Sequence, residues 1–268
     1  MKKNTYTTVP MSVGEMRVYT NGDMKLHAYH TGDPIDDQVL VVEKNGTAVV
    51  VESPCFFDSI KALTDYLNGL GLKVAGVLTA YHMAGASFLP GVKKYATKNA
   101  DEYGHTGGGK GLIDNFTAAF GSAFDSSIHT VTDTLSAGKV NIGGIDLVIV
   151  PTGEAFDVEI PGLNAVYTHM LGHDCHSIVA GAAHADAILA QLREYERRGF
   201  DLILTSHYVP EDLDDVEVKI AYLERLKAIA AGSGDKADFL TAMEREFPQY
   251  SGGNYLEMTA GMFFPGDK

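Results

Sequence analysis

Residues 77–91 read VLTAYHMAGASFLPG, and this stretch carries most of what the sequence predicts about the fold. An apolar strand, Val74 to Leu78, runs into a loop of small residues around one histidine, His82. Loops that leave the carboxyl end of a buried strand are where α/β proteins place much of their chemistry. The sequence therefore predicts a functional site around His82.

The residues of this loop resemble the metal-binding turn of the metallo-β-lactamase superfamily. The family pattern is T-H-x-H-x-D-H followed closely by glycine, whereas residues 79–85 of this chain read TAYHMAG. Thr79 and His82 match, while Ala80, Ala84 and Gly85 replace two histidines and one aspartate. The resemblance implies an α+β fold, the four-layer αββα sandwich of that family, with most of its best-known metal site lost.

Turn dipeptides support two runs of antiparallel strands. Asn21-Gly22 and Asn45-Gly46 each separate two alternating apolar segments within residues 15–51, and Gly143-Gly144 separates KVNI from IDLVIV. Both residues of such a dipeptide tolerate positive φ, which tight hairpin turns require. We expect the hairpins to begin two matching halves that face each other. The alternation of strands and helices alone also permits an ordinary three-layer α/β fold.

Helical spacing of apolar residues predicts the remaining elements. Asp58 offers an N-cap for a helix with Ile60, Leu63 and Leu67 on one face, and further helices are predicted over 185–198 and 211–231. The last 20 residues predict no clear element. No linker or short repeat interrupts the chain, so residues 1–268 are predicted to form a single metallo-β-lactamase-like domain.

Three downstream segments extend the resemblance over roughly residues 36–209. VIVPTGE, residues 148–154, resembles a family strand that ends in P-x-G-H, with Glu154 in the histidine position. NAVYTH, residues 164–169, resembles the strand whose aspartate bridges two metals, and His169 aligns with that aspartate to within one position. LILTSH, residues 202–207, resembles the strand that precedes the last histidine ligand, His207.

The resemblance thus implies a metal site made of His82, Glu154, His169 and His207. A two-metal centre of this kind needs about six or seven protein donors, so four donors predict one divalent ion. Three imidazoles and a carboxylate suit Zn, Fe, Mn or Ni. The alternative is a vestigial site that binds no metal. We expect the four side chains to converge on one coordination sphere if the metal interpretation is right.

Three further residues are candidates for catalysis. His173 lies in the cluster of His169, His173 and His176, and a small shift of the alignment would place it at the site as an acid or base. Tyr81 is expected on the wall of a rebuilt pocket beside the lost ligands. His176 is interpreted as a hydrogen-bonded loop residue, and Cys175 as a structural thiol.

The third candidate, Lys110, lies in GHTGGGKG, residues 104–111. This segment nearly matches the phosphate-loop pattern, but Gly111 replaces the hydroxyl residue that binds Mg²⁺. We therefore predict a mobile loop that reaches over the site, with Lys110 meeting an anionic group of the substrate. The alternatives are a nucleotide-binding loop and a glycine loop with Lys110 in solvent.

The composition limits partners and location. The formal net charge of -14 disfavours nucleic acid and anionic membranes as partners. No apolar run is long enough to span a bilayer, and MKKNTYTTVPMS lacks the apolar core of a secretory signal. Two cysteines, Cys55 and Cys175, predict a reducing compartment, the cytoplasm. The expected partner is a small molecule, and homo-oligomerisation is left open.

Taken with the resemblance, these observations predict a metal-dependent hydrolase of a small ester, thioester or phosphoester with a reduced, single-metal site. The alternative is a non-catalytic descendant of the fold that binds a small molecule or a partner. Whether the chain is an enzyme is left open between the two.

Overall fold

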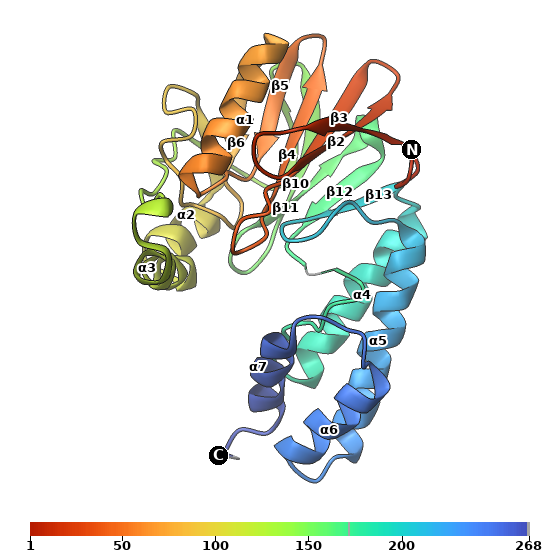
Figure 1. Cartoon of the computed structure of the whole chain (residues 1–268). Coiled ribbons are helices and arrows are strands. Elements are labelled where there is room, and N and C mark those ends of the chain that lie inside the picture. Colours follow the sequence, from red (N-terminus) through yellow and green to blue (C-terminus); the bar gives the residue numbers. More distant parts are fainter. Residues whose placement is uncertain (171, 267–268) are drawn as a thin grey trace. The chain divides into compact units, whose positions relative to one another are not determined.

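The computed structural model describes residues 1–170 and 172–266 (Figure 1). Two compact units are present: Met1–His169 with Asp201–Pro210, and Met170–Phe200 with Glu211–Lys268. We call them the sandwich unit and the helical unit, and each is described by itself. That residues 1–268 form one domain stays a prediction.

The larger sheet of the sandwich unit has eight strands in sequence order. Neighbours are antiparallel from the first to the fifth strand and parallel from the fifth to the eighth. The strands are β1 (Tyr6–Pro10), β2 (Glu15–Asn21), β3 (Met24–His30), β4 (Gln38–Lys44), β5 (Thr47–Val51), β6 (Lys73–Leu78), β7 (Lys94–Thr97) and β8 (Asp133–Leu135).

The smaller sheet has five strands in the order β13-β12-β11-β10-β9. All its neighbours are antiparallel except β12 and β13, which run parallel. The strands are β9 (Gly138–Ile142), β10 (Ile145–Pro151), β11 (Phe156–Ile160), β12 (Ala165–Thr168) and β13 (Leu202–Thr205).

All three predicted hairpins are present. Asn21 pairs with Met24, Lys44 with Thr47 and Ile142 with Ile145, so each turn dipeptide joins two strands directly. The third hairpin belongs to the smaller sheet and the first two to the larger sheet, so the two halves of the prediction correspond to two sheets. A single doubly wound parallel sheet is excluded.

Two apolar layers hold the sandwich unit together. Between the sheets, Leu40 and Val51 belong to one buried cluster with Ile149, Val158 and other side chains of the smaller sheet. On the opposite face of the larger sheet, a second cluster joins α1 (Phe57–Leu70) to the strands through side chains at helical spacing, which include Ile60, Leu63 and Leu67. This gives a helix layer and two facing sheets, which are three of the four layers of the predicted αββα class.

The start of α1 differs from the prediction. Phe56, in extended conformation, is the N-cap and offers no side-chain hydrogen bond, while Asp58 lies in the first turn. A carboxylate there still stabilises the helix because it faces the positive end of the helix dipole.

The glycine-rich segment 104–111 is helical, so the predicted mobile loop is wrong. It contains the end of α2 (Lys98–His105) and the start of α3 (Gly108–Phe120). The glycines allow close packing on Tyr103: a Cβ on Gly107 or Gly109 would lie 2.9 or 2.8 Å from atoms of that residue. Tight backbone packing, and not flexibility, explains why this position is so rich in glycine.

The helical unit contains α4 (Ala182–Arg198), α5 (Leu213–Gly232), α6 (Lys236–Glu246) and α7 (Gly253–Phe263). Asp212 and Asp215 form a capping box at the start of α5. The helix α7 was not predicted, because three glycines between positions 252 and 261 hide its apolar spacing. Among the described residues, no helix has both the length and the apolar character needed to cross a bilayer.

Candidate metal centre

Three of the four predicted ligands come together in the sandwich unit. His82, His169 and His207 each offer one ring nitrogen, and these three atoms lie within 4.8 Å of one another. The ring centroids are 5.0–5.6 Å apart, and the His169 ring is nearly perpendicular to the other two. We call this group the three-imidazole centre.

The sheet topology explains the convergence. β12 and β13 are parallel neighbours, and Thr168 pairs with Thr205, so His169 and His207 follow the same edge of the smaller sheet. His82 follows β6 of the larger sheet. Carboxyl ends of strands from both sheets therefore meet at one end of the sandwich.

A buried carboxylate connects the three turns that carry the imidazoles. Glu52, at the end of β5, accepts hydrogen bonds from the backbone N–H groups of Ala80, Tyr81 and His82 at 3.3, 2.8 and 3.0 Å. It also accepts one from the hydroxyl of Tyr167, two residues before His169.

The hydroxyl of Tyr167 lies 2.6 Å from the Oγ of Ser206, the residue before His207. Because the Tyr167 proton is given to Glu52, Ser206 donates to Tyr167. One carboxylate thus holds the turn that carries His82 directly and, through Tyr167, the other two turns. The sequence signal for it was an acidic residue closing the apolar run TAVVVES.

The electrostatics of the centre favour neutral imidazoles. Burial and the two neighbouring imidazoles hold the pKa of His82 well below its usual range. Burial also lowers the pKa of His207, against the hydrogen bond to the Ile35 carbonyl, which raises it. His169 is the most exposed of the three by surface area, yet the protein packed around its ring and His207 lower its pKa to about 3. Neutral imidazoles keep the lone pairs that bind metals.

Tyr81 lies beside the centre. Its ring stacks on that of His169, with centroids 4.4 Å apart and planes 19° apart, and its hydroxyl lies 3.0 Å from the Oγ1 of Thr152. Burial raises the pKa of Tyr81 above its ordinary value, so the hydroxyl keeps its proton. The stack fixes the orientation of the most exposed of the three imidazoles.

Asp37 is a member of the site that the sequence did not reveal. Its side chain is fully buried, and its Oδ1 lies 3.6 Å from Nδ1 of His82 and 3.4 Å from Nδ1 of His207. Burial and the nearby carboxylates of Asp33, Glu52 and Asp36 raise the pKa of Asp37 well above its usual range. The acidic run DPIDDQ ahead of a buried strand contains it, but nothing in that run distinguishes Asp37 from its acidic neighbours.

The other predicted site residues lie elsewhere. Glu154 is exposed in the turn between β10 and β11 and is not among the donors that converge with the three imidazoles. Lys110 lies in the first turn of α3, where its Nζ is 2.6 Å from the Asp114 carboxylate. His173 belongs to the helical unit. Any catalytic role of Tyr81, Lys110 or His173 stays a prediction.

The positions of the lost ligands are closed by the fold. Ala80 and Ala84 are buried in the apolar core between the sheets, together with Met83. Gly85 has φ +86°, and a Cβ there would lie 2.2 Å from the carbonyl oxygen of Pro54. The predicted pocket lined by these small residues is therefore core. The backbone itself excludes a histidine at position 85.

A second group of donors lies in the helical unit. The Oε1 of Glu211 accepts from the backbone N–H of His173 at 2.7 Å and is 2.8 Å from its Nδ1, while Asp215 is 3.5 Å from the same nitrogen. The buried ammonium of Lys219 donates to the carbonyls of Gly172 and Cys175. We call these four side chains, of His173, Glu211, Asp215 and Lys219, the His173 cluster. His176 is buried nearby, with Nδ1 3.1 Å from the hydroxyl of Tyr222, as expected for a structural residue.

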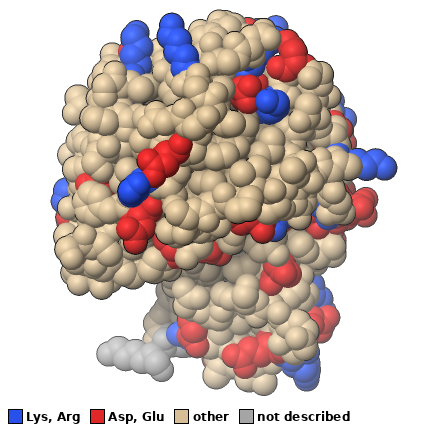
Figure 2. Space-filling view, turned by 45° about the horizontal axis from the view of Figure 1, so that its top comes forward, with Lys and Arg blue, Asp and Glu red and all other residues tan. Residues whose placement is uncertain are grey.

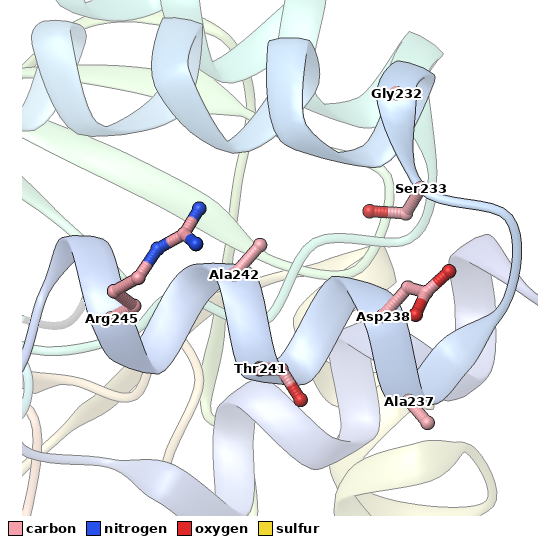
Figure 3. A pocket seen from close by; sticks show the side chains of 7 residues that line it. All are labelled: Gly232, Ser233, Ala237, Asp238, Thr241, Ala242 and Arg245. Atoms are coloured by element: carbon pink, nitrogen blue, oxygen red, sulfur yellow. The ribbon is translucent and has the colours of Figure 1, made fainter.

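The hollow shown in Figure 3 belongs to neither group. It lies between the end of α5 and α6 and is lined by residues that include Ser233, Asp238, Thr241 and Arg245. These side chains offer no imidazole or thiol, so the hollow does not resemble either donor group.

The three-imidazole centre fits a single divalent metal. Three imidazoles are a common ligand set for zinc in sites that keep an open position for substrate. Nδ1 of His82 is buried without a hydrogen-bond partner, as is Oδ1 of Asp37. Of the four predicted donors, only Glu154 does not converge with the others. A second ion has no place, because positions 84 and 85 are closed by the fold.

Comparisons with known proteins identify the architecture and nothing finer. No family model and no curated protein matches the sequence. A metallo-β-lactamase family protein from Thermus thermophilus is similar in structure, with a TM-score of 0.61, 14% identity, and 91% of this chain and 92% of that chain covered.

Two further solved structures agree. A metallo-β-lactamase from Erythrobacter litoralis matches with a TM-score of 0.58, 13% identity, and 82% and 100% of the two chains covered. The sec-alkylsulfatase Pisa1 from Pseudomonas sp. matches with a TM-score of 0.60 and 14% identity, over 89% of this chain and 48% of the alkylsulfatase. Together with the two facing sheets and the site at their end, these likenesses show that the chain has the metallo-β-lactamase fold, in a strongly divergent form.

Proposed function

We propose that the protein is a hydrolase of a small ester, thioester or phosphoester that uses one divalent metal held by His82, His169 and His207. The observation that carries the proposal is the convergence of three neutral imidazoles from three separate turns. Core histidines are usually satisfied one by one by hydrogen bonds, whereas three ring nitrogens within 4.8 Å of one another match a ligand set.

The chain's own residues have distinct roles in this proposal. A metal bound at the centre would supply Lewis-acid activation of water and of a substrate oxygen. Glu52 holds the three ligand turns in place, and Tyr81 holds the His169 ring. The Tyr81 hydroxyl keeps its proton, so it can donate a hydrogen bond to a substrate oxygen but does not act as a base.

The structural neighbours support hydrolysis without selecting a substrate. They include β-lactamases and an alkylsulfatase, so the same fold serves the cleavage of unlike bonds. β-Lactams are not part of the proposal, because the second-metal half of the centre is closed at Ala84 and Gly85. Zinc, iron, manganese and nickel all suit the imidazole donors.

Two measurements on the full chain test the proposal. Metal content after purification and dialysis should be one equivalent per chain, and it should fall to none in His82→Ala and His207→Ala. Among p-nitrophenyl carboxylate esters, phosphate esters and a thioester, at least one class should be cleaved, with loss of activity on chelation and return on adding metal. His105→Ala is the matched control, since it removes an exposed histidine that pairs with Asp101 outside both donor groups and should keep both the metal and the activity.

One observation favours the alternative of a non-catalytic binding protein. Ala80 and Ala84, at positions where the resemblance puts metal ligands, are buried core residues, which supports a centre that lacks the family's full catalytic set. A chain that binds one metal equivalent tightly but cleaves no member of the panel would support this alternative.

We extend the proposal to partners and location. A small molecule is the proposed substrate, and nucleic acid and membrane are not proposed as partners. On the face shown in Figure 2, basic and acidic side chains are interspersed without a broad basic patch. The cytoplasm is the proposed location, and homo-oligomerisation stays open.

A further inference from the structure

Asp37 lies on the side to which two of the three imidazoles, those of His82 and His207, turn their Nδ1 atoms. Its carboxylate is fully buried, and one oxygen, Oδ1, is 3.6 Å from Nδ1 of His82 and 3.4 Å from Nδ1 of His207. The other oxygen, Oδ2, accepts the thiol proton of Cys55 at 3.3 Å. A carboxylate shared between two metal-ligand candidates needs an explanation in terms of the site.

The protonation of His207 is set by its surroundings. Its Nδ1 lies 3.1 Å from the carbonyl oxygen of Ile35, which only accepts hydrogen bonds, so Nδ1 carries the proton. The lone pair of a neutral His207 is therefore on Nε2. Asp37 lies on the Nδ1 side, together with this carbonyl.

His82 presents the complementary pair of atoms. Its Nδ1 and the Oδ1 of Asp37 are both buried, and neither has a hydrogen-bond partner. Their separation of 3.6 Å exceeds the longest usual N–H···O hydrogen bond, about 3.2 Å, by only about 0.4 Å. A small rotation of the imidazole would satisfy both atoms at once and would leave Nε2 as the ligand.

No lysine or arginine among the described residues is paired with Asp37. The basic groups against its carboxylate are the two imidazoles, while Asp33, Asp36 and Glu52 are nearby carboxylates. The Asp37 carboxyl group thus faces the imidazoles and, beyond them, whatever cation they bind. Carboxylates that take the second N–H of a ligand histidine are frequent partners of metal sites.

We infer that Asp37 is a positioning residue of the three-imidazole centre: it takes the Nδ1–H of His82, faces the Nδ1–H that His207 gives to Ile35, and so directs the Nε2 lone pairs of both rings at one divalent cation. His169 is held differently, by the stack on Tyr81. The inference rests on the proposed function for the cation, but the orientation of the two rings is a property of the metal-free chain as well.

The first test is the metal affinity of the full chain, measured by titration with Zn²⁺ and, through its absorption spectrum, with Co²⁺. Asp37→Asn keeps the shape and removes the charge, and it should weaken binding about 10- to 100-fold. Asp36→Asn makes the same charge change on a neighbouring, exposed carboxylate that pairs with His30, and it should change the affinity less than about twofold. Equal affinities for Asp37→Asn and the unaltered chain would overturn the inference.

The second test needs no variant. Nitrogen NMR of ¹⁵N-labelled imidazoles in the metal-free, unaltered chain should show the Nδ1–H tautomer for His82 and His207. The Nε2–H tautomer for His82 would overturn the inference even if Asp37→Asn did not fold. If the unaltered chain took up no metal, the proposed function would fail, whereas the tautomers would still decide the role of Asp37.

Discussion

The described part of the chain contains two groups of potential metal ligands that differ in what surrounds their donor atoms. In the three-imidazole centre, Nδ1 of His82 is without a hydrogen-bond partner, and the Asp37 carboxylate lies 3.6 and 3.4 Å from the Nδ1 atoms of His82 and His207. In the His173 cluster, the imidazole is paired with Glu211, and Asp215 also caps α5. Proximity of donors is common to both groups, but in the His173 cluster the imidazole is already at hydrogen-bond distance from a carboxylate.

The two groups also differ in the charged side chains that they contain. The three-imidazole centre contains no ammonium or guanidinium group, whereas the His173 cluster already includes the buried ammonium of Lys219. A divalent cation placed beside that ammonium would meet repulsion, while one placed among neutral imidazoles would not. We therefore interpret the first group as a metal site and the second as a structural ion cluster that ties the chain before α4 to α5.

The largest expected effect comes from removing Glu52, the anchor of the three-imidazole centre. Glu52→Ala leaves three backbone N–H groups and the Tyr167 hydroxyl without their acceptor. Each of these four donors left without an acceptor costs about 1–3 kcal/mol, so we expect the free energy of unfolding to fall by at least about 4 kcal/mol and metal binding to be lost. Urea unfolding and metal titration measure the two effects.

Glu52→Gln is the control, because it keeps the shape and one carbonyl acceptor. It should lose less than half as much stability as the alanine variant. Equal losses in the two variants would contradict this expectation, because they would show that the one carbonyl acceptor kept by glutamine does not replace the carboxylate.

The second-largest loss of stability is expected at Gly85, in the part of the centre where the family has ligands and this fold is closed. Gly85→Ala combines a positive φ with a Cβ 2.2 Å from the Pro54 carbonyl, and Gly144→Ala has φ +87° with open space around the added atom. The backbone conformation alone costs about 1–2 kcal/mol. We expect thermal or urea unfolding to show that cost for Gly144→Ala and at least about 2 kcal/mol more for Gly85→Ala, the size of an overpacking penalty.

Restoring the family ligands is the stronger form of this test. The variant with Ala80→His, Ala84→Asp and Gly85→His should gain no second metal equivalent, because two of the three sites are core and the third is blocked. A folded variant that binds two equivalents would contradict this account of the lost ligands.

The pH dependence of stability tests the His173 cluster. Burial lowers the pKa of Lys219 from 10.5 to about 8, so between these values the folded chain has released a proton that the unfolded chain retains. Unfolding then takes up a proton, and the free energy of unfolding rises with pH across this window, by up to about 3 kcal/mol from this group. Urea unfolding at pH 8 and pH 10 measures the rise.

Lys219→Met should abolish that rise. At pH 7 it should also lower the free energy of unfolding by about 1–3 kcal/mol, because Glu211 loses its counter-charge and two carbonyls lose a donor. Lys227→Met is the matched control on the same helix, since Lys227 pairs with Asp186 at the surface. If the control removed the same slope, the buried cluster would not be its source.

The smallest effect is expected outside both groups. Lys110 and Asp114 form an exposed pair one helical turn apart, and such pairs contribute about 0.5 kcal/mol or less. Lys110→Ala should therefore leave metal affinity and unfolding almost unchanged, as should Lys61→Ala in the equivalent pair with Asp65. A rise in KM for anionic substrates in Lys110→Ala alone would support the predicted substrate contact.

The fold could be predicted because its signals are local. Turn dipeptides such as Asn45-Gly46 specify hairpins through backbone sterics, and apolar spacing specifies α1 and α5. Segment 104–111 was misread because its glycines serve packing on Tyr103, a contact that depends on the folded chain. In α7, glycines likewise obscured the apolar spacing that would have predicted a helix.

The sequence could predict site residues only where a ligand directly follows the end of a strand. His82, His169 and His207 each follow a strand that the fold brings to one edge, so their convergence follows from topology. Glu154 also follows a strand, but its turn is exposed, and no local pattern distinguishes the two cases. Asp37 and Glu52 act through contacts with residues far along the chain, which composition and spacing do not encode.

The attachment of all three ligand turns to Glu52 has a consequence for the thermodynamics of metal uptake. Since the turns are already ordered by hydrogen bonds in the metal-free chain, their conformational entropy is lost during folding and not during binding. Metal binding should therefore show little unfavourable conformational entropy in calorimetry, as in other preorganised sites. The anchor that makes this centre sensitive to a single substitution is also what makes it ready for its ion.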